Sequence, residues 1–393
     1  MIIYDKTNLD NLIIQEQVSN ALHMNMLDND DFTKVSAAYP VSFYTPNIFI
    51  RSGLFILTCI IVSFSVGLLT LMLSDLHLVD NWGYILFLGI ITYAALEFVV
   101  KTNKHYRSGI DDALIWISAG FFLTAYLWPT FSGSTIDDTS YFLSVTGVVG
   151  LLALYYTLRF SDALAAAICF LAFFAFIAME WNRIAAFGSA TLPFMLIAVS
   201  FASWLFARMA GKSAKAIYYL SCLDVVQIIS LLTLYLAGNY FVVQNLGNML
   251  FDTDENSPGS LPFAPFFWIW SVLLPFVYIG WGLKKKDVIM LRAGMLLIAA
   301  AVFTFKIYYH VAPIEVTLAL GGAAFLVISY SIRRYLKTPK HGFTYEDLNE
   351  NHMLDKINVE SLLITETFSD SPAPAENRFG GGDFGGGGSS SGF

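Results

Sequence analysis

The sequence predicts an all-α polytopic membrane protein, with about ten transmembrane helices arranged in sequential antiparallel hairpins. One observation is a succession of long apolar segments between residues 53 and 332. A helix needs roughly 20 apolar residues to cross about 30 Å of hydrocarbon. The second observation is composition, because 56% of the residues are hydrophobic and only 13% are charged. A soluble domain typically has about 25% charged residues, so this chain is not expected to be one.

Each predicted span is a segment of about 20 residues bounded by polar or charged positions. We place the ten spans at roughly 53–74, 82–100, 112–129, 140–158, 162–180, 191–209, 217–238, 263–283, 288–306 and 312–332. The longest connection, 239–262, contains "YFVVQNLGNMLF", which has a mixed composition suited to the membrane interface, followed by a polar turn. A solvated connector is the simplest interpretation of this loop.

Basic residues predict the orientation, because Lys and Arg favour cytoplasmic connections. They occur in alternate connections, whereas the other connections contain only Arg183 and Lys306. An even number of spans and two cytoplasmic termini follow from this alternation. The basic positions are Arg51, Lys101, Lys104, Arg107, Arg159, Arg208, Lys212, Lys215, Lys284, Lys285, Lys286, Arg292, Arg333, Arg334, Lys337 and Lys340.

The net charge of −8 is concentrated in the two ends of the chain. Residues 1–50 contain six acidic and two basic residues, and residues 341–393 contain nine acidic and two basic residues. Acidic tails argue against binding of nucleic acid. The three cysteines lie in apolar runs without metal-ligand spacing. Because no catalytic or nucleotide-binding motif occurs in a suitable context, we predict no catalytic residue, cofactor or metal and do not expect an enzyme.

Four regions follow from these patterns. Residues 1–50 form a cytoplasmic amphipathic helix and a link, 51–335 form the ten-span domain, 336–368 form an acidic helical segment, and 369–393 form a disordered Gly/Ser-rich tail. The N-terminal helix is expected at 7–27, with Thr7 and Asp10 spaced like a capping box. Ile14, Val18 and Leu22 share one of its faces, which favours packing on the cytoplasmic end of the bundle.

An acidic residue opens several spans that enter from the predicted cytoplasmic side. Asp112, Asp162, Asp224 and Asp287 recur at intervals of about one helical hairpin, which suggests a weak internal repeat. Helix capping is the simpler interpretation of Asp112, Asp162 and Asp287. Asp224 differs because it lies one or two turns inside its apolar run. We therefore predict that Asp224 faces the bundle and has a polar or basic partner.

Together, these patterns define a candidate intramembrane polar site. It consists of Glu97, Asp112, Arg159, Asp162, Asp224 and Gln227. The site could be a polar cavity for a cation or proton, because acids within a membrane usually face a partner or water. It could instead be a set of caps and ion pairs that fix helix packing. We favour the second interpretation, because most of the charges lie near span ends.

The C-terminal tail, "FGGGDFGGGGSSSGF", is too rich in Gly and Ser to form a core. Its three phenylalanines are spaced along a flexible segment and form a candidate partner-binding tail for other membrane proteins: Phe379, Phe384 and Phe393. The tail is similar to those of some TPM-domain membrane proteins. "AAYPVSFYTPNIFIRSGLF" and "YRSGIDDAL" resemble a family of bacterial multi-pass membrane proteins of unknown function. The resemblance implies a short cytoplasmic helical segment before the spans and a location in the bacterial inner membrane.

Two functional hypotheses follow. The first is a scaffold or accessory subunit of the membrane that binds partners through its cytoplasmic tails. The second is a transporter or channel that uses Glu97 and Asp224, which requires a water-filled path and discontinuous helices near the middle of the membrane. Neither the oligomeric state nor the identity of a partner follows from the sequence.

Overall fold

A computed structural model describes residues 2–23, 26–74, 81–133, 138–184, 188–251 and 263–309, together with isolated positions between 322 and 334. These residues belong to one compact unit, Met1–Leu348. The predicted tenth span, the acidic segment and the C-terminal tail lie outside the described ranges, apart from those isolated positions. Among the described residues the protein is all-α, as predicted, with one isolated bridge between Tyr44 and His105.

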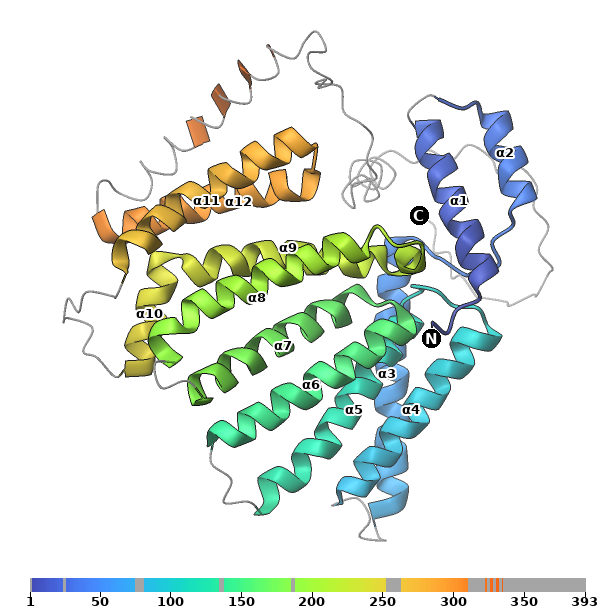
Figure 1. Cartoon of the computed structure of the whole chain (residues 1–393). Helices are drawn as coiled ribbons and strands as arrows, with labels where there is room; N and C mark the ends of the chain where they lie inside the picture. The colour runs from blue at the N-terminus through green and yellow to red at the C-terminus, as the bar shows by residue number, and fades with distance from the viewer. Residues whose placement is uncertain are drawn as a thin grey trace, which may run out of the picture. The chain divides into compact units, whose positions relative to one another are not determined.

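The helices follow the chain in the order shown in Figure 1. They are α1 Lys6–His23, α2 Asn29–Ala38, α3 Ile48–Leu73, α4 Trp82–Thr102, α5 Ile110–Gly133, α6 Asp138–Phe160, α7 Ala163–Ile184, α8 Gly188–Ala210, the 3₁₀ helix η2 Ala214–Tyr219, α9 Leu220–Gly238, α10 Tyr240–Phe251, α11 Ala264–Lys285 and α12 Val288–Tyr309.

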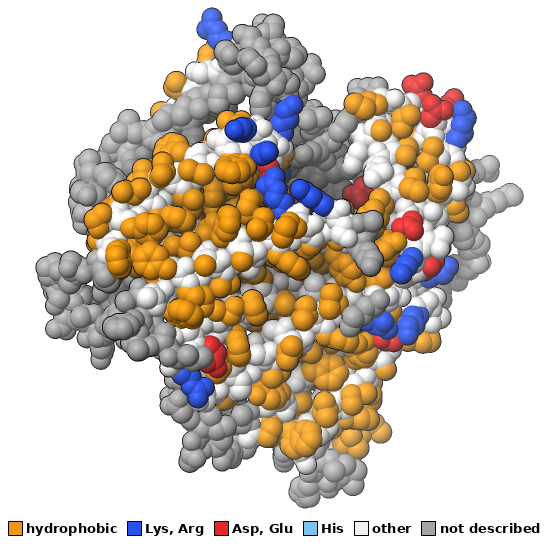
Figure 2. Space-filling view, viewed as in Figure 1, with side chains coloured by type: hydrophobic (Ala, Val, Ile, Leu, Met, Phe, Trp, Pro, Cys, Tyr) orange, Lys and Arg blue, Asp and Glu red, His pale blue; other side chains and the backbone are white. Residues whose placement is uncertain are grey.

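Length and composition make eight of the described helices candidates for crossing a membrane, namely α3 to α9 and α11. The described apolar part of α12, Val288–Thr304, is shorter. The protein is therefore a multi-pass membrane protein. Many hydrophobic side chains are exposed on the described helices, and Figure 2 shows them in orange across one face, as contact with lipid requires. The total of ten spans remains a prediction.

Four hairpins form the centre of the fold. The closest helix packing joins α4 to α5, α6 to α7, α8 to α9 and α11 to α12. We name these pairs the first, second, third and fourth hairpins. Each is closed at the end of the bundle where α4 ends and α5 begins, which we call the proximal end; the opposite end is distal. Each predicted Asp of the repeat lies at or near the start of the second helix of a hairpin.

Three local features differ from the expectations. The first span begins at Ile48 rather than near residue 53, because Asn47 caps it by accepting a hydrogen bond from the Ile50 backbone N–H at 3.0 Å. Arg51 therefore lies inside the first turn of α3. The N-terminal helix is capped by Asp5 rather than by Thr7. The Asp5 carboxylate accepts a hydrogen bond from the Thr7 backbone N–H at 3.3 Å. The mixed segment after residue 239 is a helix, α10.

Asn239 explains the separate helix α10. Its side-chain oxygen accepts hydrogen bonds from the backbone N–H groups of Phe241 and Val242, so it caps the start of α10. Its amide nitrogen donates to the hydroxyls of Tyr235 and Thr304, at 3.0 and 3.1 Å. Asn239 is almost completely buried. The Asn239 side chain therefore marks the boundary between α9 and α10 and joins both helices to α12. This boundary lies at the distal end rather than in the middle of a span.

Candidate functional site

Charged side chains gather at the proximal end, where they join neighbouring hairpins. Figure 2 shows Lys and Arg side chains, in blue, concentrated toward one end of the helices. Among the described residues, three ion pairs connect helices that are not adjacent in sequence: Arg51 with Asp112, Arg159 with Glu97, and Arg208 with Asp287. These pairs link α3 to the first hairpin, the first hairpin to the second, and the third hairpin to the fourth.

Glu97 is the centre of the pair between the first two hairpins. Its Oε1 accepts hydrogen bonds from Arg159 Nη2 at 2.7 Å and from the Tyr93 hydroxyl at 2.8 Å. Its Oε2 accepts a hydrogen bond from Lys101 Nζ at 2.7 Å. The Tyr93 hydroxyl also contacts the Tyr155 hydroxyl. Both carboxylate oxygens are thus occupied by protein donors, an arrangement that fixes the position of α4 against α6.

Asp112 has a different role from the predicted helix cap. Its Oδ2 accepts a hydrogen bond from Arg51 Nε at 2.7 Å, across from α3. The neighbouring residue, Asp111, is almost completely buried. Its two oxygens accept hydrogen bonds from the backbone N–H groups of Arg107 and Ser108, at 2.7 and 2.8 Å. Asp112 therefore pairs with α3, and Asp111 holds the turn that precedes α5.

The turn that Asp111 holds is strained and closely packed. Lys104 and Arg107 have positive φ angles of 54° and 49°, and Gly109 has a φ angle of 95°. A Cβ on Gly109 would lie 2.1 Å from the Arg51 carbonyl oxygen. Only glycine allows the α3 backbone to come this close. The contact places Arg51 beside Asp112.

Asp162 and Asp287 are helix caps, as their spacing indicates. Asp162 Oδ1 accepts a hydrogen bond from the Ala165 backbone N–H at 2.6 Å, and Asp287 Oδ1 accepts one from the Met290 N–H at 3.2 Å. Burial raises the pKa of Asp162 above its usual value, with the nearby Asp112 carboxylate adding to the effect. Asp162 lies between α6 and α7, outside the membrane-spanning helices.

The two remaining candidates, Asp224 and Gln227, do not join this cluster. Asp224 has an exposed side chain on α9, and among the described residues no hydrogen bond or ion pair is assigned to it. The described residues thus give the predicted partner no support. Because η2 precedes α9, Asp224 lies in the second turn of that helix, near the proximal end. Gln227, one turn further on, is partly buried.

The first residues of the chain complete the proximal end. Tyr4 and Leu9 are buried among side chains of α4, α5, α6 and α7. The Ile3 backbone N–H donates a hydrogen bond to the Arg159 carbonyl at 3.0 Å, and Asp10 accepts one from the Tyr218 hydroxyl at 2.8 Å. Burial raises the pKa of Tyr4 well above 10, so its hydroxyl remains neutral. The N-terminal segment therefore covers the proximal end of α4 to α7, where the ion pairs lie.

Glu97 and Arg159, two of the candidate residues, are brought together by the structure, whereas Tyr93, Arg51 and Asp111 belong to the cluster without having been among the candidates. In the sequence, Arg51 indicates only the orientation of the first span. The sequence "YRSGIDDAL" contained the strongest local indication, since its glycine and paired acids mark a tight, capped turn.

A pH dependence is expected from Asp162. Because its pKa is raised in the folded state, the folded protein binds a proton more readily than the unfolded chain. Stability should therefore decrease as pH rises from about 3.9, the usual value for Asp, through the raised pKa. Asp162→Asn keeps the cap and removes the charge, so it should be at least as stable as wild type at pH 7, with a difference that shrinks toward pH 4. Asp162→Ala loses the cap and should cost about 1 kcal/mol.

Thermal unfolding of the detergent-solubilised protein across this pH range checks both substitutions. A difference between wild type and Asp162→Asn that grows as the pH falls would contradict the assigned direction.

Comparison with known proteins adds no relative. No protein-family model, curated protein or solved structure matches the chain. Within the described ranges, no group of three or more His, Cys, Asp or Glu side chains could hold a metal ion. A function must therefore be inferred from the geometry of the chain itself.

Proposed function

We propose that this multi-pass membrane protein is a scaffold or accessory subunit of a bacterial inner membrane, which binds partners through cytoplasmic N- and C-terminal segments. The observation that carries the proposal is the hairpin of α1 and α2 at the proximal end. Its first helix is anchored by Tyr4 and Leu9, whereas α2 has no buried residue. A helix held in a fixed place with most of its surface accessible is suited to contact a partner.

Polar contacts within this N-terminal hairpin support a fixed position for α2. Gln15 of α1 donates hydrogen bonds to the carbonyls of Ser36 and Tyr39, at 3.4 and 2.7 Å. Asn11 donates to the Pro40 carbonyl at 2.8 Å. The accessible surface of α2 includes the acidic residues Asp30 and Asp31, which would complement a basic partner surface.

The transport hypothesis has less support. Glu97 is bonded to three side-chain donors near the end of α4, and Asp224 is exposed on α9, so the two acids do not line one path. The break between α9 and α10 lies at the distal end rather than in the middle of a span. The charged groups instead fasten hairpins to one another, which is the role expected in a structural membrane protein.

Site-specific photo-crosslinking tests the scaffold proposal. A photoreactive residue at Lys34, whose side chain is 75% exposed on α2, should form a discrete adduct with a specific protein in living cells. The matched control is Phe64 of α3, which is 76% exposed on the apolar flank and should react with lipid. Deleting residues 379–393 should leave folding intact and reduce recovery of the same partner. Identical adduct patterns at both positions, together with an unchanged partner set after the deletion, would overturn the proposal.

A topology measurement tests the orientation on which the proposal depends. In a variant lacking Cys59, Cys169 and Cys222, a cysteine at Ser213 should be reached only from the cytoplasm. A cysteine at Asn256, which lies outside the described residues, should react from the opposite side. The physical reason is the concentration of basic residues at the proximal end. Labelling of both positions from the same side would rule out the proposed topology.

A further inference from the structure

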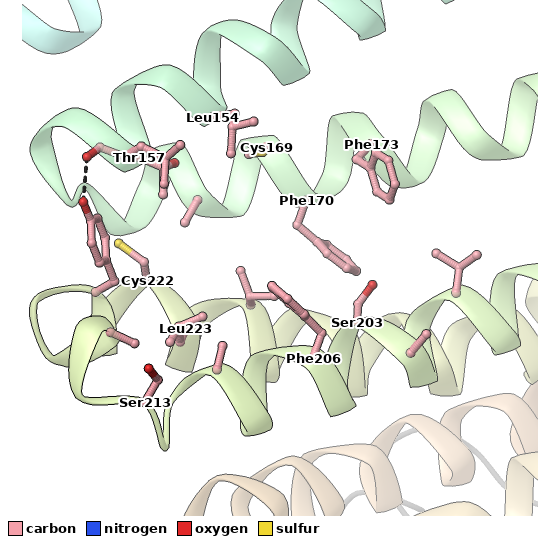
Figure 3. Close-up of a pocket in the computed structure, with 18 of the residues that line it drawn as sticks. Leu154, Thr157, Cys169, Phe170, Phe173, Ser203, Phe206, Ser213, Cys222 and Leu223 are labelled. Atoms are coloured by element: carbon pink, nitrogen blue, oxygen red, sulfur yellow. Dashed lines mark hydrogen bonds between the residues drawn. The ribbon is translucent and has the colours of Figure 1, made fainter. Parts of the chain in front are cut away.

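A lateral groove separates the second hairpin from the third. It has a volume of about 820 Å³ and lies among α6, α7, α8, η2 and α9. Figure 3 shows Phe170 and Phe173 on one wall facing Ser203 and Phe206 on the other. The two hairpins are joined beside it by neutral hydrogen bonds. Ser161 donates to the Tyr218 carbonyl at 2.6 Å, and Tyr219 donates to the Leu158 carbonyl at 2.8 Å, the dashed line in Figure 3.

The groove is suited to an apolar occupant. Most of its lining is aliphatic or aromatic, including Leu154, Ile177 and Val226. Two of its hydroxyls are already bonded within the protein. Thr157 donates to the Ala153 carbonyl at 2.8 Å, and Tyr219 donates to Leu158 as described above. A ligand therefore gains little from polar groups here and gains from apolar contact.

The position of the groove limits what can enter it. Its lining on α7 runs from Ala166 to Ile177, eleven residue steps or roughly 16 Å along the helix. That is about half of the 30 Å hydrocarbon thickness. The lining begins close to the proximal end, and Phe206, which lines the groove, is 65% exposed. The groove thus opens toward the acyl chains of a single leaflet.

A basic residue lies where a lipid headgroup would be. Lys212 is exposed between Ala210 and Ser213, both of which line the proximal end of the groove. The nearby Arg208 forms an ion pair with Asp287 at 3.2 Å, so Lys212 is the basic residue considered for the headgroup. Basic residues beside clefts between membrane helices attract anionic lipid headgroups. We propose that the groove binds an anionic phospholipid, with one acyl chain between the second and third hairpins and the phosphate at Lys212. This site is independent of the scaffold role.

Native mass spectrometry of protein reconstituted in equal parts of phosphatidylglycerol and phosphatidylcholine tests the acyl-chain contact. After extraction in mild detergent, the wild-type protein should retain one phospholipid. Ala202→Trp places a large side chain in the groove and should reduce retention at least tenfold. Ala95→Trp on α4 introduces the same side chain at an exposed position that does not line the groove, and it should retain lipid like wild type. Equal retention by both tryptophan variants would overturn the proposal.

The headgroup contact has a separate readout in the same experiment. Lys212→Gln should reduce the preference for phosphatidylglycerol over phosphatidylcholine about fivefold, the effect expected for one basic residue near the membrane surface. Lys284 is an exposed basic residue at the proximal end of α11, away from the groove lining. As the matched control, Lys284→Gln should leave the preference for phosphatidylglycerol unchanged. An unchanged preference in Lys212→Gln would remove the anionic headgroup from the proposal and contradict it.

The native cysteines provide a test that requires no substitution. Cys169 lines the groove, whereas Cys59 lies on α3, away from it. A lipid-soluble maleimide should modify Cys169 several-fold more slowly in phosphatidylglycerol bilayers than in phosphatidylcholine bilayers, with Cys59 changing much less because its surroundings are apolar in both. Equal protection of both thiols, or protection of Cys169 by a second copy of the chain in lipid-free detergent, would overturn the proposal.

Discussion

Gly109→Ala is expected to destabilise the protein by at least about 3 kcal/mol, the largest effect of any substitution considered. Gly109 has a φ of +95°, where a side chain adds about 1–2 kcal/mol of strain. The new Cβ would also lie 2.1 Å from the Arg51 carbonyl oxygen and 3.0 Å from the Phe55 backbone nitrogen. These are backbone atoms of α3, so the whole start of that helix must move, and the Arg51–Asp112 pair must open with it.

Unfolding by SDS titration measures this effect. Gly120→Ala is the matched control, because Gly120 lies in the same helix, α5, with no atom within 4 Å of a new Cβ. It should be neutral or stabilising by up to about 1 kcal/mol, since alanine is the better helix former. Similar unfolding midpoints for the two variants would show that α3 does not approach Gly109 as closely as described.

Glu97→Ala is expected to cost about 2–3 kcal/mol, somewhat below the range for a fully buried ion pair. The substitution removes the carboxylate that binds Arg159, Lys101 and Tyr93, and it leaves the Arg159 side chain, 24% exposed, without its acidic partner. Removing one member of a desolvated pair costs more than the pair itself contributes, because the remaining charge has lost its compensation.

Glu180→Ala is the matched control at the distal end. Its partner, Arg183, is 56% exposed at a separation of 3.9 Å, so the loss should be below about 1 kcal/mol. Replacing Glu97 and Arg159 together with Leu and Met should recover part of the lost stability, measured as a double-mutant cycle in the same SDS titration. If Glu97→Ala costs no more than Glu180→Ala, Glu97 does not join the first two hairpins.

The architecture was largely predictable because the bilayer imposes a simple constraint. A backbone in hydrocarbon must satisfy its own hydrogen bonds, so long apolar runs become helices whatever their neighbours are. The fourth predicted span, 140–158, lies within α6, Asp138–Phe160, and the spans on either side agree as closely. The recurrence of acids at hairpin intervals also indicated the starts of α7 and α12, because a cap depends only on residues within one turn.

The helix boundaries that sequence misjudged depend on individual polar side chains. Asn47 lengthens α3 by a turn, and Asn239 begins α10 where a connector was expected. The sequence of a mixed apolar and polar segment does not show whether a buried amide will have hydrogen-bond partners. The Asn239 amide has them on α9 and α12, and only the tertiary structure shows this.

The sequence by itself determined that this chain forms apolar helices in hairpins, with charge concentrated at one end. Only the tertiary structure decided which charges meet. Glu97 and Arg159 are 62 positions apart, and Arg51 and Asp112 are 61 apart. Periodicity shows how a helix is patterned, but it does not show which hairpin lies beside it or how each helix is rotated about its axis. Those choices depend on close contacts such as Gly109 against α3. The packing of the hairpins likewise leaves Asp224 exposed and a groove open between the second and third hairpins.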